Sequence, residues 1–462
     1  MLYNYFKRII ALLFLMQSWQ LLFGQHEHMN MNADSSMQID NMQMSMTADS
    51  TKFMSSSFSR HLPMTIDGSG TSWLPADSRM EAVMWNKKNT QIMMHGALWL
   101  RGDFQNANNS SGRQHSNTFD APNWIMAMID QRAGKHGLLN FSIMMSLDAL
   151  TAGRGGYPLL FQTGESWKGQ PLVDRQHPHD LFAGLSVAYT YAFTRDIDLT
   201  AYFGFPGEPC IGPPVFMHRP SAFYMPDAPI SHHWQDATHI SFGVGTIGFR
   251  YKILKVEGSI FTGREPDENR FDFDRPRFDS YAARVSVNPD KHLSLQVSYA
   301  YIKSPEQLFP TENIHRITSS AIYAHQWRKQ RIDATLAYGL NIGNVPSGSI
   351  LLEATYRVMK FSAYGRYEWV QKTNEELNLP GDKDYRHPLN DITIGASYNI
   401  LTFYHVGLDL GAQTIISLPD NSLKALYGVT PVSAEVYLMI HPMTALGLAK
   451  RKQTQSMDGM KM

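Results

Sequence analysis

The chain of 462 residues has a single cysteine, Cys210, and its 41 basic residues equal its 41 acidic residues. One cysteine cannot form an internal disulfide, and it excludes a metal site built from several thiolates. Balanced charge gives no basic surface of the kind that binds nucleic acid, so we expect no nucleic-acid partner. The sequence also lacks the Gly-x-Ser-x-Gly elbow of many serine hydrolases.

Long apolar runs are scarce as well. Lys7 and Arg8 precede a short apolar run that ends near Gly24, and this order is typical of a secretory signal peptide over residues 1–24. An uncleaved membrane anchor is the alternative. Beyond this segment we find no uncharged apolar stretch long enough for a membrane-spanning helix. An exported chain without such helices can still span a membrane as a closed β-barrel.

Two segments have the composition of tails. Residues 25–90 are rich in Met, Ser, Asn and Asp near their start and carry His26 and His28. A segment of this kind buries too little apolar surface to form a core, so we expect a disordered periplasmic tail rich in Met and His. Residues 444–462 predict a second, short periplasmic tail that is basic and carries methionines.

Between the tails, residues 91–443 contain short runs in which apolar and polar residues alternate strictly. Residues 293–301 and 332–340 are two examples, with apolar or aromatic side chains at every second position. This period of two is typical of strands with one apolar and one polar face. The polar face carries bulky charges such as Arg101, Arg284 and Glu353, which favours a polar lumen inside and lipid outside.

The lengths of the connections point the same way. Short turns, for example near Gly134 and Lys252, alternate with long connections such as residues 151–176 and 206–236. Short turns on one rim and long loops on the other are typical of outer-membrane barrels. We therefore predict an all-β fold, a transmembrane antiparallel β-barrel of about 16 strands. An even strand number leaves both termini in the periplasm and the long loops on the outer rim.

Residues 91–443 resemble the outer-membrane β-barrel superfamily of Gram-negative bacteria in this architecture. The resemblance implies location in the outer membrane and contact with its lipid. Four loops, at residues 176–180, 216–220, 232–236 and 263–270, also resemble those of an uncharacterised barrel family that is associated with heavy-metal and copper handling. This second resemblance implies no particular functional residue.

Histidines recur in the long loops and supply the candidate metal ligands. These are His177, His179, Asp180, His218, His232, His233, Asp236 and His239, together with His26 and His28 of the tail. His, Asp and Met side chains together suit Cu, Ni or Zn, and Met favours Cu(I). The ends of adjacent strands lie close together in a barrel, so we expect His179 to approach His239 near the outer rim. The alternative is that these histidines only hold the loops in place.

We therefore expect an outer-membrane barrel that binds or passes a small solute or metal ion, copper first, through a lumen constricted by its loops. One alternative is a sealed structural barrel whose periplasmic tails recruit a protein partner. Another is a lipid hydrolase, because His239 and Ser241 have the spacing of outer-membrane phospholipases. The Asn-Gly continuation of that motif is missing, so we expect no enzyme. The ion, the direction of transport and the oligomeric state are left open.

Overall fold

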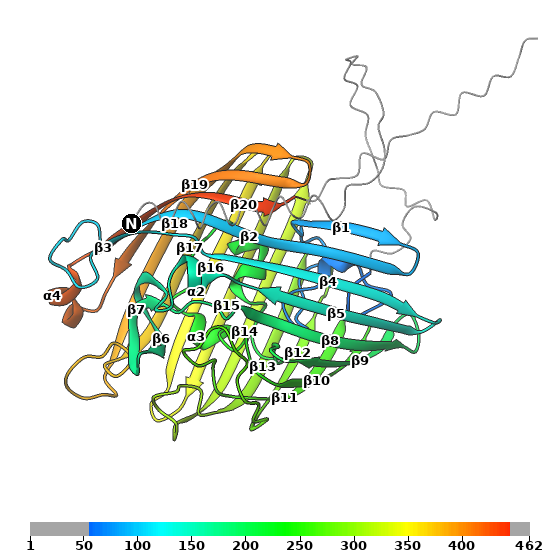
Figure 1. Cartoon of the computed structure of the whole chain (residues 1–462), viewed down its shortest axis with the longest axis horizontal. Coiled ribbons are helices and arrows are strands. Elements are labelled where there is room, and N and C mark those ends of the chain that lie inside the picture. Colours follow the sequence, from blue (N-terminus) through cyan, green and yellow to red (C-terminus); the bar gives the residue numbers. More distant parts are fainter. Residues whose placement is uncertain (1–54, 444–462) are drawn as a thin grey trace, which may run out of the picture. The chain divides into compact units, whose positions relative to one another are not determined.

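The computed structural model describes residues 55–443, and most of them belong to one antiparallel sheet of 18 strands. Sixteen of these strands pair in a ring that forms a closed barrel (Figure 1). The ring closes where β2 pairs with β20, with Leu98 opposite Ile440. The predicted all-β barrel of about 16 strands is therefore confirmed. The predicted signal peptide, residues 25–54 and the C-terminal tail lie outside the described residues.

In ring order the wall strands are β2 (Thr90–Gln105), β4 (Asn123–Ala133), β5 (Gly137–Met145), β8 (Phe182–Ala192), β9 (Ile197–Gly204), β10 (Val244–Tyr251), β11 (Leu254–Phe261), β12 (Ser280–Val287), β13 (Leu293–Lys303), β14 (Asn313–Trp327), β15 (Gln330–Ile342), β16 (Ser347–Val358), β17 (Phe361–Thr373), β18 (Arg386–Phe403), β19 (Val406–Leu418) and β20 (Val432–Pro442). Two shorter strands pair with the two ends of β2, namely β1 (Ala82–Lys87) and β3 (Ser116–Asp120).

The connections hold the remaining elements: η1 (Met64–Ile66), α2 (Asp148–Thr151), β6 (Tyr157–Trp167), β7 (Gln170–Gln176), η2 (Phe216–His218), η3 (Pro220–Ala222), α3 (His232–Gln235), η4 (Asn421–Leu423) and α4 (Lys424–Tyr427). β6 and β7 form a separate two-stranded sheet. Within residues 55–443, no helix has the length and apolar character needed to cross a membrane.

The wall exposes its apolar side chains and buries its charged ones. On β13, Val297 is 58% exposed while its neighbours Gln296 and Ser298 are buried, and on β12 the side chain of Arg284 is 1% exposed. A soluble sandwich would bury the valine and expose the arginine. The apolar face therefore points outward to lipid and the charged face lines the lumen, as in a transmembrane barrel of the outer-membrane type.

Short and long connections sort the barrel into two ends. β10 and β11 are separated by two residues, 252–253, and β16 and β17 by residues 359–360. On the other side, residues 205–243 separate β9 from β10. We name these the short-turn end and the long-loop end. The last strand finishes at the short-turn end, where the Met443 amide donates to the His405 carbonyl at 2.8 Å.

Residues 55–81, which we name the plug, correct the prediction of a disordered tail. The plug lies inside the short-turn end and is hydrogen-bonded to several parts of the wall. Ser59 Oγ donates to Asp198 on β9 at 2.6 Å, and Asn288, just after β12, donates to the Leu74 carbonyl at 2.9 Å. A polar segment that cannot build its own core is ordered here because the polar lumen supplies its hydrogen-bond partners.

Residues 205–243, which we name the inner loop, fold into the lumen next to the plug. The Gly212 amide donates to Ser298 on β13 at 2.9 Å, and Tyr437 on β20 donates to the Tyr224 carbonyl at 2.7 Å. The inner loop thus joins walls that are nearly opposite in the ring. The β6–β7 hairpin also reaches the wall, since Lys372 on β17 donates to Thr163 at 2.8 Å. The lumen is therefore constricted by its loops, as predicted.

Candidate functional site

Seven histidines gather inside the barrel, and we name them the histidine cluster: His95, His177, His179, His218, His232, His233 and His239. Six of them are buried and His218 is partly buried. They come from β2, from the connection between β7 and β8, and from the inner loop with its helices η2 and α3. The prediction placed the loop histidines at the outer rim, whereas those of the inner loop lie in the lumen, because the inner loop folds inward and is bound there by wall side chains.

The rings follow one another in contact. Ring centroids are 6.0 Å apart for His177 and His233, 5.5 Å for His233 and His232, 5.2 Å for His232 and His239, and 5.6 Å for His239 and His179. The structure thus brings His179 and His239 together, as the strand order had indicated.

His218 lies against the wall. Its ring lies 5.2 Å from that of His95 on β2 and 4.8 Å from that of Trp124 on β4. The ring contacts therefore form two groups, one of five imidazoles from His177 to His179 and one that joins His218 to His95 on the wall.

Two of the predicted ligands have other partners. Asp180 pairs with Arg270 across 3.4 Å. Asp236 belongs to the site as a support, since its Oδ1 lies 2.6 Å from Nδ1 of His232. His26 and His28 lie outside the described residues.

Burial keeps four imidazoles of the histidine cluster uncharged. It lowers the pKa of His233 to about 4. Burial, reinforced by neighbouring positive groups, lowers the pKa values of His177 and His218 well below the ordinary 6.5, and that of His239 is lowered in the same way. At neutral pH these rings are therefore neutral, and each has one nitrogen with a free lone pair.

Hydrogen bonds orient three of the rings alike. Nδ1 of His179 lies 2.7 Å from Oδ2 of Asp148, Nδ1 of His232 contacts Asp236, and Nδ1 of His239 lies 3.0 Å from the Asp236 carbonyl. A neutral ring that donates from Nδ1 keeps its lone pair on Nε2. Many histidines that bind metals through Nε2 are held in this way, by a hydrogen bond from the other ring nitrogen. Nε2 of His239 and of His233 has no hydrogen-bond partner among the described residues.

A second group, which we name the His–Glu group, adjoins the cluster at the long-loop end. One ligand atom each of His233, Glu265 and Glu306 lies within 4.8 Å of the others. They line a cavity of about 180 Å³. Burial raises the pKa of Glu265 to about 6, and burial together with Glu265 raises the pKa of Glu306 to about 7. Sequence reasoning did not link either glutamate to His233, because both lie in other loops of the chain.

A third group faces the plug. His95 and His218 line a small cavity of about 50 Å³ between the plug and the inner loop, together with Met80, Met93, Met126, Met128 and Met217. We name this the methionine cavity. Met93 and Met128 are buried. Period-two alternation places Met126 and Met128 on one face of β4, but only the folded plug brings Met80 to them.

The hydrolase alternative gains no support from the geometry at its motif. Ser241 Oγ donates to the Thr262 carbonyl at 2.6 Å, while Nδ1 of His239 pairs with the Asp236 carbonyl. The two side chains are thus held by different backbone groups, and their spacing produces no serine–histidine hydrogen bond.

Comparison with known proteins identifies other barrels of this type. The sequence matches no protein-family model and no curated protein. Among solved structures, OmpF of Salmonella typhi in complex with daunomycin is 11% identical, with a TM-score of 0.49, over 78% of this chain and 100% of that one. Pseudomonas putida OprB is 10% identical, with a TM-score of 0.47, over 77% and 94%.

An anion-selective porin from Comamonas acidovorans is also similar, at 10% identity and a TM-score of 0.45, over 76% of this chain and 99% of the porin. At such identities and TM-scores, these similarities carry no information about what this chain binds or transports. The closed barrel with a lipid-facing wall, and the histidine cluster inside it, are properties of this chain's own structure.

Proposed function

We propose that this outer-membrane barrel binds a transition-metal ion in its lumen and passes it along the histidine cluster, with copper as the ion. The observation that carries this proposal is the set of buried imidazoles between two cavities, with His233 lining one cavity and His95 and His218 lining the other. Burying many ring nitrogens without hydrogen-bond partners is costly. An ion that binds these lone pairs offsets that cost.

The donors along the path favour copper. The His–Glu group offers nitrogen and carboxylate oxygen, the histidine cluster offers nitrogen, and the methionine cavity adds thioether sulfur. Imidazole suits copper, and methionine favours Cu(I) over harder ions. Several neighbouring sites of moderate affinity allow an ion to move from one to the next.

The orientation of the path follows from the usual arrangement of such barrels. Short turns of outer-membrane barrels face the periplasm. The His–Glu group would then face outward, and the plug, the methionine cavity and both tails would face the periplasm. A Met- and His-rich tail at that side suits capture or delivery of the same metal.

One observation favours the second candidate, a sealed barrel that recruits a periplasmic partner. The plug is hydrogen-bonded around the short-turn end, from Asp198 on β9 to Glu81, which pairs with Arg357 on β16 at 2.6 Å. A sealed barrel can bind metal but does not transport it, whereas a barrel with an open path binds metal on one side of the membrane and releases it on the other.

Metal flux into lipid vesicles separates the two candidates. Purified full-length protein is reconstituted into vesicles that hold a copper-sensitive dye, and Cu(I) or Cu(II) is added outside. We expect flux in the wild type and at least a tenfold loss when His179 and His239 are both replaced by Ala. His315→Ala is the control, because this exposed histidine pairs with Tyr299 on the outer face. Absence of flux in the wild type favours the sealed barrel, and equal flux in all variants removes the proposed path.

A further inference from the structure

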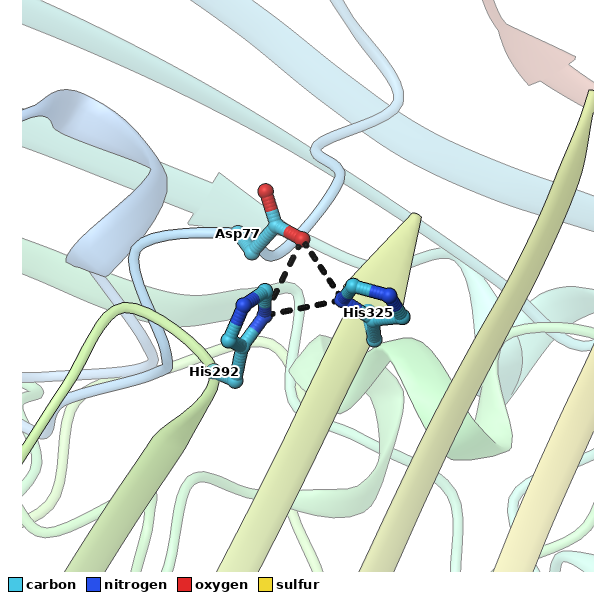
Figure 2. Close-up of side chains that lie close together, drawn as sticks. All are labelled: Asp77, His292 and His325. Atoms are coloured by element: carbon cyan, nitrogen blue, oxygen red, sulfur yellow. Dashed lines mark hydrogen bonds and ion pairs between the residues drawn. The ribbon is translucent and has the colours of Figure 1, made fainter. Parts of the chain in front are cut away.

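A separate group of side chains joins the plug to the wall at the short-turn end (Figure 2). Asp77 belongs to the plug, His292 to the turn between β12 and β13, and His325 to β14. The two Nδ1 atoms lie 3.1 Å apart, and Oδ2 of Asp77 lies 3.3 Å from Nδ1 of His292 and 3.8 Å from Nδ1 of His325. Figure 2 shows the three groups turned toward one another.

These separations match a tetrahedral metal ion. With Zn–N and Zn–O distances of about 2.0–2.1 Å, two ligand atoms of a tetrahedral site lie about 3.3–3.4 Å apart. The three measured separations lie around this value. Two imidazole nitrogens and one carboxylate oxygen are ordinary zinc ligands, and they leave a fourth position for water.

The surroundings fix the group without covering it. The ring of His325 stacks on Trp327, with centroids 5.2 Å apart, and the Asp77 amide donates to the Lys291 carbonyl at 2.8 Å. The Asp77, His292 and His325 side chains are 25%, 24% and 35% exposed, so an ion can reach them from solvent. Nδ1 of His292 also lies 3.1 Å from the Ala324 carbonyl, so its proton has a partner until a metal displaces it.

We propose that Asp77, His292 and His325 bind a divalent metal ion of the Zn²⁺ class, and that this ion fastens the plug to the barrel wall. The carboxylate comes from the plug and both imidazoles come from the wall, so the complete ligand set exists only while the plug is in place. Metal that binds this arrangement alone stabilises it against release of the plug. The site is independent of the path through the histidine cluster, and it holds whether or not the barrel passes an ion.

Zinc stoichiometry tests the site. Full-length protein in detergent is equilibrated with Zn²⁺, desalted and analysed for bound metal. We expect the variant with His292 and His325 both replaced by Ala to hold one Zn²⁺ fewer than the wild type, and Asp77→Asn to bind that ion at least tenfold more weakly. In the wild type, the Gln326 amide donates to Oδ2 of Asp77 at 3.1 Å. The side-chain oxygen of Asn can accept the same hydrogen bond, so the plug retains this contact in the variant.

His136→Ala is the matched control. His136 lies in the short turn between β4 and β5, and its Nδ1 pairs with the Ala192 carbonyl at 2.8 Å. We expect it to bind as much zinc as the wild type. If the double variant and Asp77→Asn also match the wild type, the three residues form an ion pair only and the site is overturned.

Hydrogen exchange tests the fastening. We expect Zn²⁺ to slow amide exchange in residues 67–81 of the wild type at least tenfold, and to leave exchange there unchanged in Asp77→Asn. Exchange on β20, which is nearly opposite the group in the ring order, serves as the internal reference. If Asp77, His292 and His325 bind zinc but amide exchange in the plug does not slow, the fastening role is overturned.

Discussion

Asp236 holds His232 and Arg219 at the same time: its Oδ1 lies 2.6 Å from Nδ1 of His232, and its Oδ2 lies 2.5 Å from Nη1 of Arg219. Burial by itself would raise the pKa of Asp236, but Arg219 and His232 outweigh it and hold this pKa below its ordinary range. The carboxylate is therefore charged at neutral pH. It fixes His232 as the tautomer that has its proton on Nδ1 and its lone pair on Nε2.

Replacing this carboxylate should weaken metal binding in the lumen. For Asp236→Asn we expect copper affinity to fall about 10- to 100-fold, since supports of this kind orient the ligand and raise its basicity. Arg219 keeps its pair with Glu353, at 2.7 Å, so the inner loop stays attached to the wall. Competition with a chelator measures the affinity. Asp180→Asn is the control, because Asp180 pairs with Arg270, and an equal loss in both variants would contradict a specific role for Asp236.

The methionine cavity predicts a loss that depends on the metal. Replacing Met93, Met126 and Met128 by Leu conserves volume and usually costs less than about 1.5 kcal/mol at each site. It removes three thioethers, so we expect retention of Cu(I) or Ag(I) to fall at least tenfold while Zn²⁺ retention stays the same. Metal analysis after dialysis gives both values. Unchanged silver retention would mean that these methionines only fill space.

Removal of the plug should open the barrel. The wall strands pair with one another without residues 55–80, so we expect the variant lacking them to form a barrel in detergent. Planar-bilayer recordings should then give a higher single-channel conductance than the full-length chain, because barrels of this size leave an aqueous channel when nothing fills them. Equal conductance would assign the constriction to the inner loop and the β6–β7 hairpin alone.

The low pKa of His233 predicts a pH-dependent stability. Its ordinary pKa is 6.5, and burial lowers this to about 4 in the folded chain. As pH falls from 6.5 to 4, the unfolded chain gains a proton that the folded chain does not bind. Stability is thereby lost, up to about 3 kcal/mol at about 1.4 kcal/mol per pH unit.

Urea-induced unfolding of wild type and His233→Gln across this pH range measures the effect. The difference between the two proteins isolates His233 from Glu306, whose raised pKa of about 7 acts in the opposite direction between pH 4.5 and 7. We expect the wild type to lose more stability than the variant on acidification. Parallel curves would mean that His233 takes up its proton at an ordinary pH in the folded protein.

Most of the barrel follows from local sequence. Alternation at Val297 and its neighbours is a property of adjacent residues, because successive side chains of a strand point to opposite faces. Turn lengths are equally local, and the short turn at Lys252 and the long connection of residues 205–243 appear where the sequence indicates them. Which face meets lipid also followed, since charges such as Arg284 recur on one face of the strands only.

What fills the barrel was decided by tertiary structure. Residues 55–81 have the composition of a disordered tail, and they fold because Asp198, Lys255 and Asn288, from distant parts of the chain, bind their polar groups. Loop histidines were visible in the sequence, but their place in the lumen depends on contacts of the inner loop with the far wall. The sequence around Glu306 and Asp77 did not indicate a metal site, because their partner residues lie next to them only once the ring of strands has closed. The sequence by itself therefore determined the wall, through interactions between near neighbours, while long-range polar contacts determined the contents of the lumen.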